Sequence, residues 1–67
     1  MFDKNKLKAK FVENGLTMEQ VAQLLGINPV TLYRKMSGDS EFTRNEIAML
    51  KNALNISLEE ISNIFFA

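Results

Sequence analysis

The side chains best suited to recognise another molecule are concentrated in the stretch LLGINPVTLYRKMSG, residues 24–38. Asn28 followed by Pro29 is typical of a helix start, and it comes soon after a glycine that can end a preceding helix. We expect this second helix to display on its surface Val30, Thr31, Tyr33 and Arg34. Such a surface could enter a DNA groove, contact another protein, or simply face water.

The sequence offers little for covalent or metal chemistry. It contains no cysteine and no histidine, which excludes thiolate nucleophiles, disulfides and imidazole catalysis. No carboxylate cluster, no nucleophile paired with a base and no glycine-rich phosphate loop is evident. We therefore predict that the protein is not an enzyme and has no catalytic residue, no metal site and no cofactor.

The chain has 67 residues, which fits a single small domain over residues 1–67. Its apolar runs are too short to cross a membrane, and the start MFDKNKLKAK lacks the apolar stretch of a signal peptide. We expect a soluble cytoplasmic protein that makes no membrane contact.

The charge is balanced overall but polarised along the chain. The formal net charge is zero, which argues mildly against a protein that grips nucleic acid by charge alone. Residues 1–35 carry six Lys and Arg against three Asp and Glu, whereas residues 36–67 carry two against five. The first half could therefore face phosphates while the second half faces water.

Five short helices are predicted from their start and stop signals. Three begin with a capping box, in which a Ser or Thr and a Glu or Gln three residues later each accept a hydrogen bond from the other's backbone N–H: TMEQ, TRNE and SLEE. The first helix has Asp3 as an N-cap and Gly15 after its end. We expect the helices to start near Lys4, Thr17, Asn28, Thr43 and Ser57.

Apolar residues recur at helical spacing, so one face of each helix is expected to be buried. The predicted core comprises Leu7, Phe11, Val21, Ala22, Leu25, Leu32, Met36, Ile47, Leu50, Leu54, Ile61, Ile64 and Phe65. Adjacent residues of a helix cannot both face one core, so we expect Phe65 inside and Phe66 near the surface, or the reverse. The exposed ring would be either a frayed end or a contact surface for a second copy or a partner.

Ala22, Gly26 and Leu32 are spaced as a helix-turn-helix requires. A side chain larger than Ala22 would push the two helices apart, and Gly26 gives the chain the freedom to turn between them. Ile27 and Leu32 can then hold the second helix against the first.

The segments GLTMEQVAQLLGINPVTLYRKMSG and FTRNEIAMLKNALNIS resemble the Cro/repressor-type (lambda repressor-like, XRE) helix-turn-helix family of phage and bacterial regulators. The resemblance extends from about Leu7 to Ile61. It implies an all-α, five-helix lambda repressor-like DNA-binding domain whose second and third helices form the helix-turn-helix. It also implies binding to operator DNA, often as a homodimer. The phage-like stretch TLYRKMSGDSEFTRNEI indicates a regulator from a temperate phage or prophage.

The resemblance also implies which side chains contact DNA. In the family, the first residues of the third helix and those one turn further on face base edges, and here these positions hold Pro29, Val30, Tyr33 and Arg34. Arg34 could bond to guanine O6 and N7, and Val30 could touch a thymine methyl group. Tyr33 could lie along the groove wall or bond to a phosphate.

The remaining predicted contacts are with the DNA backbone. In the family the start of the second helix approaches this backbone, and here it holds Thr17 and Met18, whose amides could serve a phosphate. Further phosphate contacts are expected from Asn28, Thr31, Lys35 and Ser37.

The sequence departs from the family pattern at three points, and two of them, the absent base-bonding side chains and the zero net charge, support a second hypothesis. Pro29 and Val30 offer no side-chain hydrogen bond, Lys35 stands where an apolar residue is common, and the net charge is zero. The first hypothesis is a regulator of a phage genetic switch that reads operator DNA. The alternative is an antirepressor that uses Pro29, Val30 and Tyr33 to bind a phage repressor instead of DNA.

Overall fold

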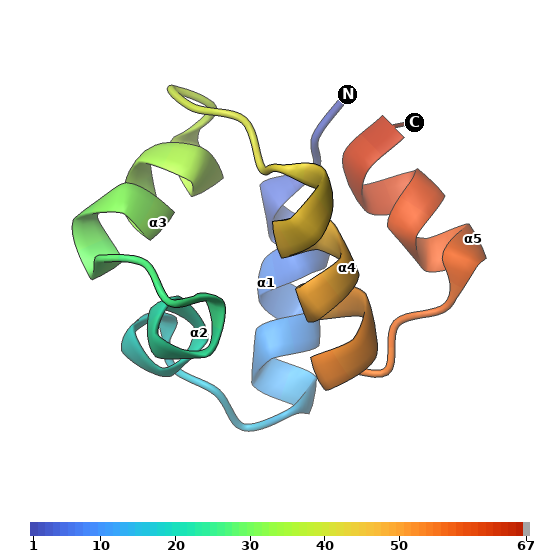
Figure 1. The fold of residues 1–67 in the computed structure, drawn as a ribbon. Coiled ribbons are helices and arrows are strands. Elements are labelled where there is room, and N and C mark those ends of the chain that lie inside the picture. The colour runs from blue at the N-terminus through green and yellow to red at the C-terminus, as the bar shows by residue number, and fades with distance from the viewer. Residues whose placement is uncertain (67) are drawn as a thin grey trace.

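The computed structural model describes residues 1–66 and consists of short helices joined by tight turns. Figure 1 shows α2 and α3 on one side of the molecule and α5 on the other, with α1 and α4 between them. The helices are α1 (Lys4–Glu13), α2 (Met18–Leu25), α3 (Pro29–Ser37), α4 (Arg44–Ala53) and α5 (Leu58–Ile61), followed by a π-helical turn, η1 (Ser62–Phe66). The predicted all-α architecture is confirmed.

The predicted helix starts are confirmed by their hydrogen bonds. The Thr17 hydroxyl accepts the backbone N–H of Gln20 at 3.2 Å, and the Gln20 side chain accepts the N–H of Thr17 at 2.9 Å. Reciprocal pairs of the same kind begin α4, with Thr43 and Glu46, and α5, with Ser57 and Glu60. Each cap contributes about 1 kcal/mol, so these ends are determined by residues only three positions apart.

The turn between α2 and α3 depends on a left-handed backbone at Gly26. Its φ angle is 70°, and its N–H bonds back to the carbonyls of Ala22 and Gln23. A side chain added at Gly26 would meet nothing within 4 Å, so substitution there would cost backbone strain and not a clash. The next residue continues the closure, because the Ile27 N–H donates to the carbonyl of Ala22 at 3.0 Å.

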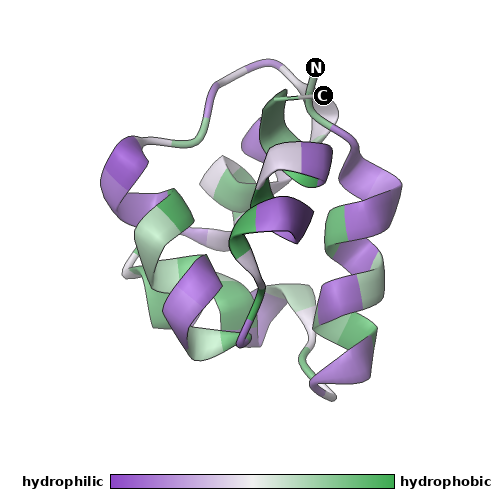
Figure 2. Ribbon diagram, turned by 90° about the vertical axis from the view of Figure 1, so that its right-hand side faces the viewer, coloured by the Kyte–Doolittle hydropathy of each residue, from purple (hydrophilic) through white to green (hydrophobic). Residues whose placement is uncertain are grey.

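The core lies where the inner faces of the helices meet. In Figure 2 each long helix carries both hydrophilic and hydrophobic residues, as expected for helices with one buried face. Of the predicted core residues only Ile47 is not fully buried; it is half-buried and packs against the others. The core also includes Ile56, which directly follows the left-handed residue Asn55 after the end of α4.

The two ends of the chain are held together by aromatic rings. Phe2, Phe42 and Phe65 form a cluster whose ring centroids lie 5.4 to 5.5 Å apart. The Asp3 N–H donates to the carbonyl of Ile64 at 2.6 Å. Phe65 is buried and Phe66 is 67% exposed, which confirms the first of the two predicted arrangements.

Within residues 1–66, no helix combines the length and the apolar character needed to cross a membrane.

Candidate nucleic-acid interface

The outward side of α3 presents four side chains in one row. Val30, Tyr33, Arg34 and Ser37, here called the α3 outer face, recur at intervals of three and four residues and therefore lie on one side of the helix. All four are exposed, and Val30 and Tyr33 are 57% and 58% accessible. The opposite side of α3 is buried, since Leu32 and Met36 belong to the core. The structure therefore brings these four predicted contacts together on one surface.

Arg34 carries the only cation of this outer face. Across the described residues, no ion pair or side-chain hydrogen bond engages its guanidinium. An unengaged guanidinium keeps all five donors for a ligand, and its fork matches the O6 and N7 acceptors of guanine. Ser37 is less free, because its hydroxyl donates to the Arg34 carbonyl at 3.0 Å and lies 3.3 Å from an Asp39 carboxylate oxygen.

The residues at the start of α3 are partly used in building the helix. The Asn28 side-chain oxygen accepts the Val30 N–H at 2.9 Å and caps the helix, which leaves its amide nitrogen able to donate elsewhere. Pro29 and Thr31 are half-buried at the edge of the α3 outer face. These three residues border the row without belonging to it.

The start of α2 contributes backbone groups more than side chains. Thr17 is exposed, but its hydroxyl already accepts the Gln20 N–H as the N-cap. Met18 is half-buried and packs against the core. The positive end of the α2 dipole and the free amides of its first turn remain as the groups that could meet a phosphate.

Lys35 does not lie where a phosphate contact requires it. It shares the inner side of α3 with Leu32 and Met36 and is only 8% exposed. Its ammonium donates to the Glu46 carboxylate and to the Glu41 carbonyl, both at 2.9 Å. The prediction of a phosphate contact at Lys35 is therefore corrected, because this charge is buried and already bonded to two acceptors inside the protein.

Glu46 is the partner that inspection of the sequence missed. Its capping-box role was predicted, but its ion pair with Lys35 joins residues eleven positions apart on different helices. The sequence contained a sign of this pair. Lys35 lies three residues after Leu32 and therefore on the same, apolar side of the helix. Buried lysines are found almost only with a partner, so a nearby carboxylate was to be expected.

Comparison with protein families supports this arrangement. The family model described as Helix-turn-helix matches residues 7–61. The chain belongs to the helix-turn-helix family. Members of this family are DNA-binding transcription regulators of the XRE type and are typically not enzymes. Comparisons with curated proteins and with solved structures give no match.

Outside the helix-turn-helix, α1 carries the largest concentration of lysines. Lys4, Lys6 and Lys8 are exposed, whereas Lys10 is paired with Glu60 and with Glu13. The hydrogen bonds that Lys10 donates to Glu60 and then to Glu13 raise the pKa of Lys10 above its usual value. Only the first three ammonium groups are therefore available to a polyanion.

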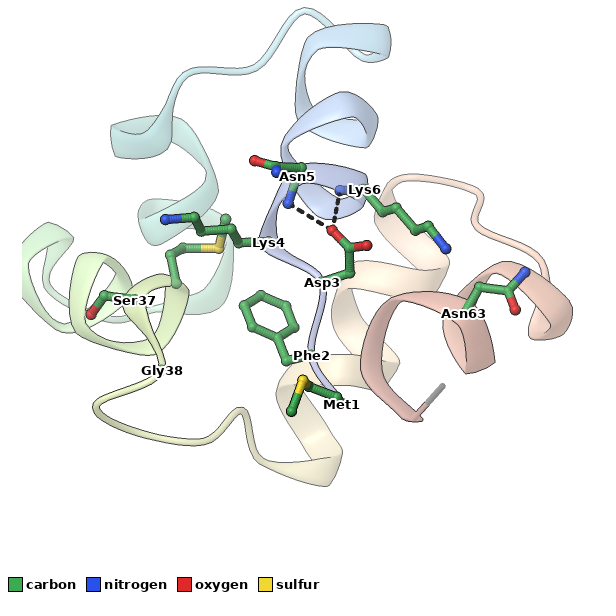
Figure 3. A pocket seen from close by; sticks show the side chains of 10 residues that line it. Met1, Phe2, Asp3, Lys4, Asn5, Lys6, Ser37, Gly38 and Asn63 are labelled. Carbon is green, nitrogen blue, oxygen red and sulfur yellow. Dashed lines mark hydrogen bonds between the residues drawn. The ribbon is translucent and has the colours of Figure 1, made fainter.

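A groove separates the start of α1 from the end of α3. Figure 3 shows Lys4 extending toward α3 and the Asp3 carboxylate turned back to accept the N–H groups of Asn5 and Lys6. One Asp3 carboxylate oxygen is therefore already engaged in capping α1, at the edge of this groove.

The ion pair between Lys35 and Glu46 makes the stability of the fold depend on pH. Burial by itself would raise the pKa of Glu46, but hydrogen bonds from the Thr43 backbone N–H and from Lys35 outweigh it and hold that pKa below 4.5. A lowered pKa means that the ionised form stabilises the fold above the pKa of the unfolded chain. This contribution is lost as the pH falls through the folded value.

We therefore expect Glu46→Gln to lower the free energy of unfolding at pH 7, with a difference from the wild type that shrinks below about pH 4. Urea titrations of both proteins, at pH 7 and again below about pH 4, would measure this difference in the free energy of unfolding. Glu60 also has a lowered pKa, through Lys10 first, but it is present in both proteins and cancels. A difference independent of pH would show that the charge of Glu46 is not what stabilises the fold.

Proposed function

We propose that this protein is a sequence-specific regulator of a phage or prophage genetic switch, acting in the cytoplasm and reading operator DNA with the α3 outer face. The observation that supports this most directly is the exposed, unpartnered guanidinium of Arg34 on the recognition helix of a helix-turn-helix domain. In this family of motifs the second helix enters the major groove and the first crosses the backbone.

Each side chain then has a distinct task. Arg34 bonds to guanine, Val30 contacts a thymine methyl group, and Tyr33 lies along the groove wall or bonds to a phosphate. The phosphates are held by the free amides in the first turn of α2, beginning at Met18 next to the cap residue Thr17, and by the border residues Asn28 and Thr31 with Ser37 of the outer face. Two copies would read half-sites about 34 Å apart, with the exposed Phe66 ring as a contact surface between them.

Fluorescence anisotropy against DNA from the promoter region flanking its own gene tests this proposal. We expect tight binding to one segment, with an affinity that falls steeply between low and moderate salt as counterions are released. Absence of binding at low salt, with the helical circular dichroism spectrum intact, would refute DNA recognition by this domain.

A second candidate function rests on the apolar character of the same surface. Val30 and Tyr33 are more than half exposed, and no base-bonding side chain stands at the head of α3. These features suit an antirepressor that binds a phage repressor in a one-to-one complex. Aromatic and apolar anchors of this kind dominate the energy of protein interfaces.

Under this alternative, Val30→Asp or Tyr33→Ala should abolish co-elution with the cognate repressor, because a charge or a void would occupy the centre of the interface. The matched control is Val12→Asp, since Val12 is 77% exposed on α1, outside the helix-turn-helix. Size-exclusion chromatography of the mixed proteins is the measurement. If the unaltered protein fails to co-elute with the repressor, this candidate is removed.

A further inference from the structure

Lys35 is an energetically costly residue for its position. It lies between Leu32 and Met36 on the buried side of α3, where an apolar side chain would fit without desolvating a charge. Moving an ammonium group out of water costs several kcal/mol, and a buried ion pair is often no more stabilising than a well-packed apolar pair. Stability alone therefore does not account for a lysine here, whereas directional bonding does.

The ammonium of Lys35 joins three separate parts of the chain. It bonds to the carbonyl of Glu41 in the loop over residues 38–43 and to the carboxylate of Glu46 in the first turn of α4. The same Glu46 oxygen accepts the Thr43 N–H at 2.8 Å, so one atom serves both the cap of α4 and the ion pair. The ammonium also lies 5.9 Å from the centre of the Phe42 ring.

These bonds act at the C-terminal end of α3. The α3 helix packs chiefly against α2, and its C-terminal end continues into the loop that leads to α4 (Figure 1). Arg34 directly precedes Lys35, so a rotation or tilt of this end displaces the guanidinium. Hydrogen bonds of fixed direction resist such motion better than apolar contacts, which tolerate sliding.

We propose that Lys35 and Glu46 are positioning residues for DNA recognition: their ion pair sets the orientation of α3 against the first turn of α4 and so aims Arg34, without either side chain touching DNA. The inference rests on the proposed DNA-binding function and adds to it two residues that lie off the binding surface. We call the pair the α3–α4 clamp.

The variant Glu46→Gln distinguishes an effect of the clamp from an effect of net charge on DNA binding. The change removes a negative charge, so attraction to DNA alone predicts tighter binding, whereas loss of the clamp predicts weaker binding. We expect affinity to fall roughly three- to thirtyfold, the range typical of residues that act on a site through others. Glutamine can still accept the Thr43 N–H, so the cap of α4 is retained. Its neutral oxygen holds the Lys35 ammonium much less strongly than a carboxylate does, so the ion pair of the clamp is lost.

The matched control is Glu41→Gln, which removes the same charge from an exposed side chain. Lys35 bonds only to the backbone carbonyl of Glu41, so this variant leaves the clamp intact. We expect its affinity for DNA to equal or slightly exceed that of the wild type. Equal tightening in Glu46→Gln and Glu41→Gln would overturn the proposal.

Lys35→Met provides the second arm, with an apolar side chain of similar length that can fill the same buried space. We expect weaker binding with the salt dependence unchanged, since a positioning residue releases no counterion from DNA. A lysine that contacts a phosphate would lower the slope of log K against log salt by about 0.9 when removed. A slope reduced by that amount, or unchanged affinity, would overturn the proposal.

Amide hydrogen exchange tests the clamp without DNA. The N–H groups of Asp39 and Ser40 donate to the Arg34 carbonyl at the end of α3, at 2.9 and 3.4 Å. Relative to the amides of α1, their exchange should accelerate in Glu46→Gln and Lys35→Met but not in Glu41→Gln. If the wild type binds no DNA, faster exchange in these two variants would still show that the clamp holds the end of α3, although the proposed function would be refuted. Unchanged relative exchange in both variants would refute the clamp itself.

Discussion

Arg34→Ala should weaken binding to the preferred DNA segment by about ten- to a hundredfold at fixed salt. A bidentate arginine–guanine contact contributes roughly 1–3 kcal/mol of discrimination, and Arg34 is the only cation on the α3 outer face. The substitution lies on an exposed surface, so the fold should be unaffected. Anisotropy titrations against the preferred segment and against a scrambled duplex are the measurement.

The ratio of the affinities for the preferred segment and the scrambled duplex shows whether Arg34 contacts a base or the phosphate backbone. If Arg34 reads a base, its removal lowers affinity for the preferred segment more than for the scrambled duplex, and the ratio approaches one. Arg44→Ala is the control, because it removes the same charge from an exposed position at the start of α4. That variant should change both affinities equally. Equal losses in Arg34→Ala as well would assign Arg34 to the phosphate backbone, and no loss would contradict the proposed interface.

Leu32→Ala should unfold a large fraction of the protein at moderate temperature. Leu32 is fully buried on the inner side of α3, and truncating such a leucine costs about 2–5 kcal/mol. A domain of this length has a total stability of only about 3–10 kcal/mol. We expect the midpoint of thermal unfolding to fall by at least about 10 °C.

Val30→Ala is the matched control on the same helix. Val30 is 57% exposed, so its truncation removes little buried area and alanine favours the helix slightly. Its unfolding midpoint, followed by circular dichroism, should stay within a few degrees of the wild type. An equal fall in both variants would mean that the inner and outer sides of α3 are not distinguished as the structure has them.

Helix ends are the part of the fold that the sequence determined most completely. The capping boxes at Thr17, Thr43 and Ser57, the N-caps at Asp3 and Asn28, and the turn at Gly26 all occur as predicted. Each depends on hydrogen bonds between residues at most a few positions apart, so the local sequence contains all the information required. The inward and outward sides of α3 followed from spacing for the same reason, except at Lys35.

Tertiary structure alone decided which distant groups meet. The family resemblance implied a phosphate contact for Lys35, but the path of the loop over residues 38–43 brings Glu46 to its ammonium inside the protein. The aromatic cluster likewise joins Phe2, Phe42 and Phe65 from three separate segments, and with it settles that Phe65 faces inward and Phe66 outward. Such contacts depend on how the helices cross, and the energies that select the crossing come from the whole core and not from neighbours in the chain.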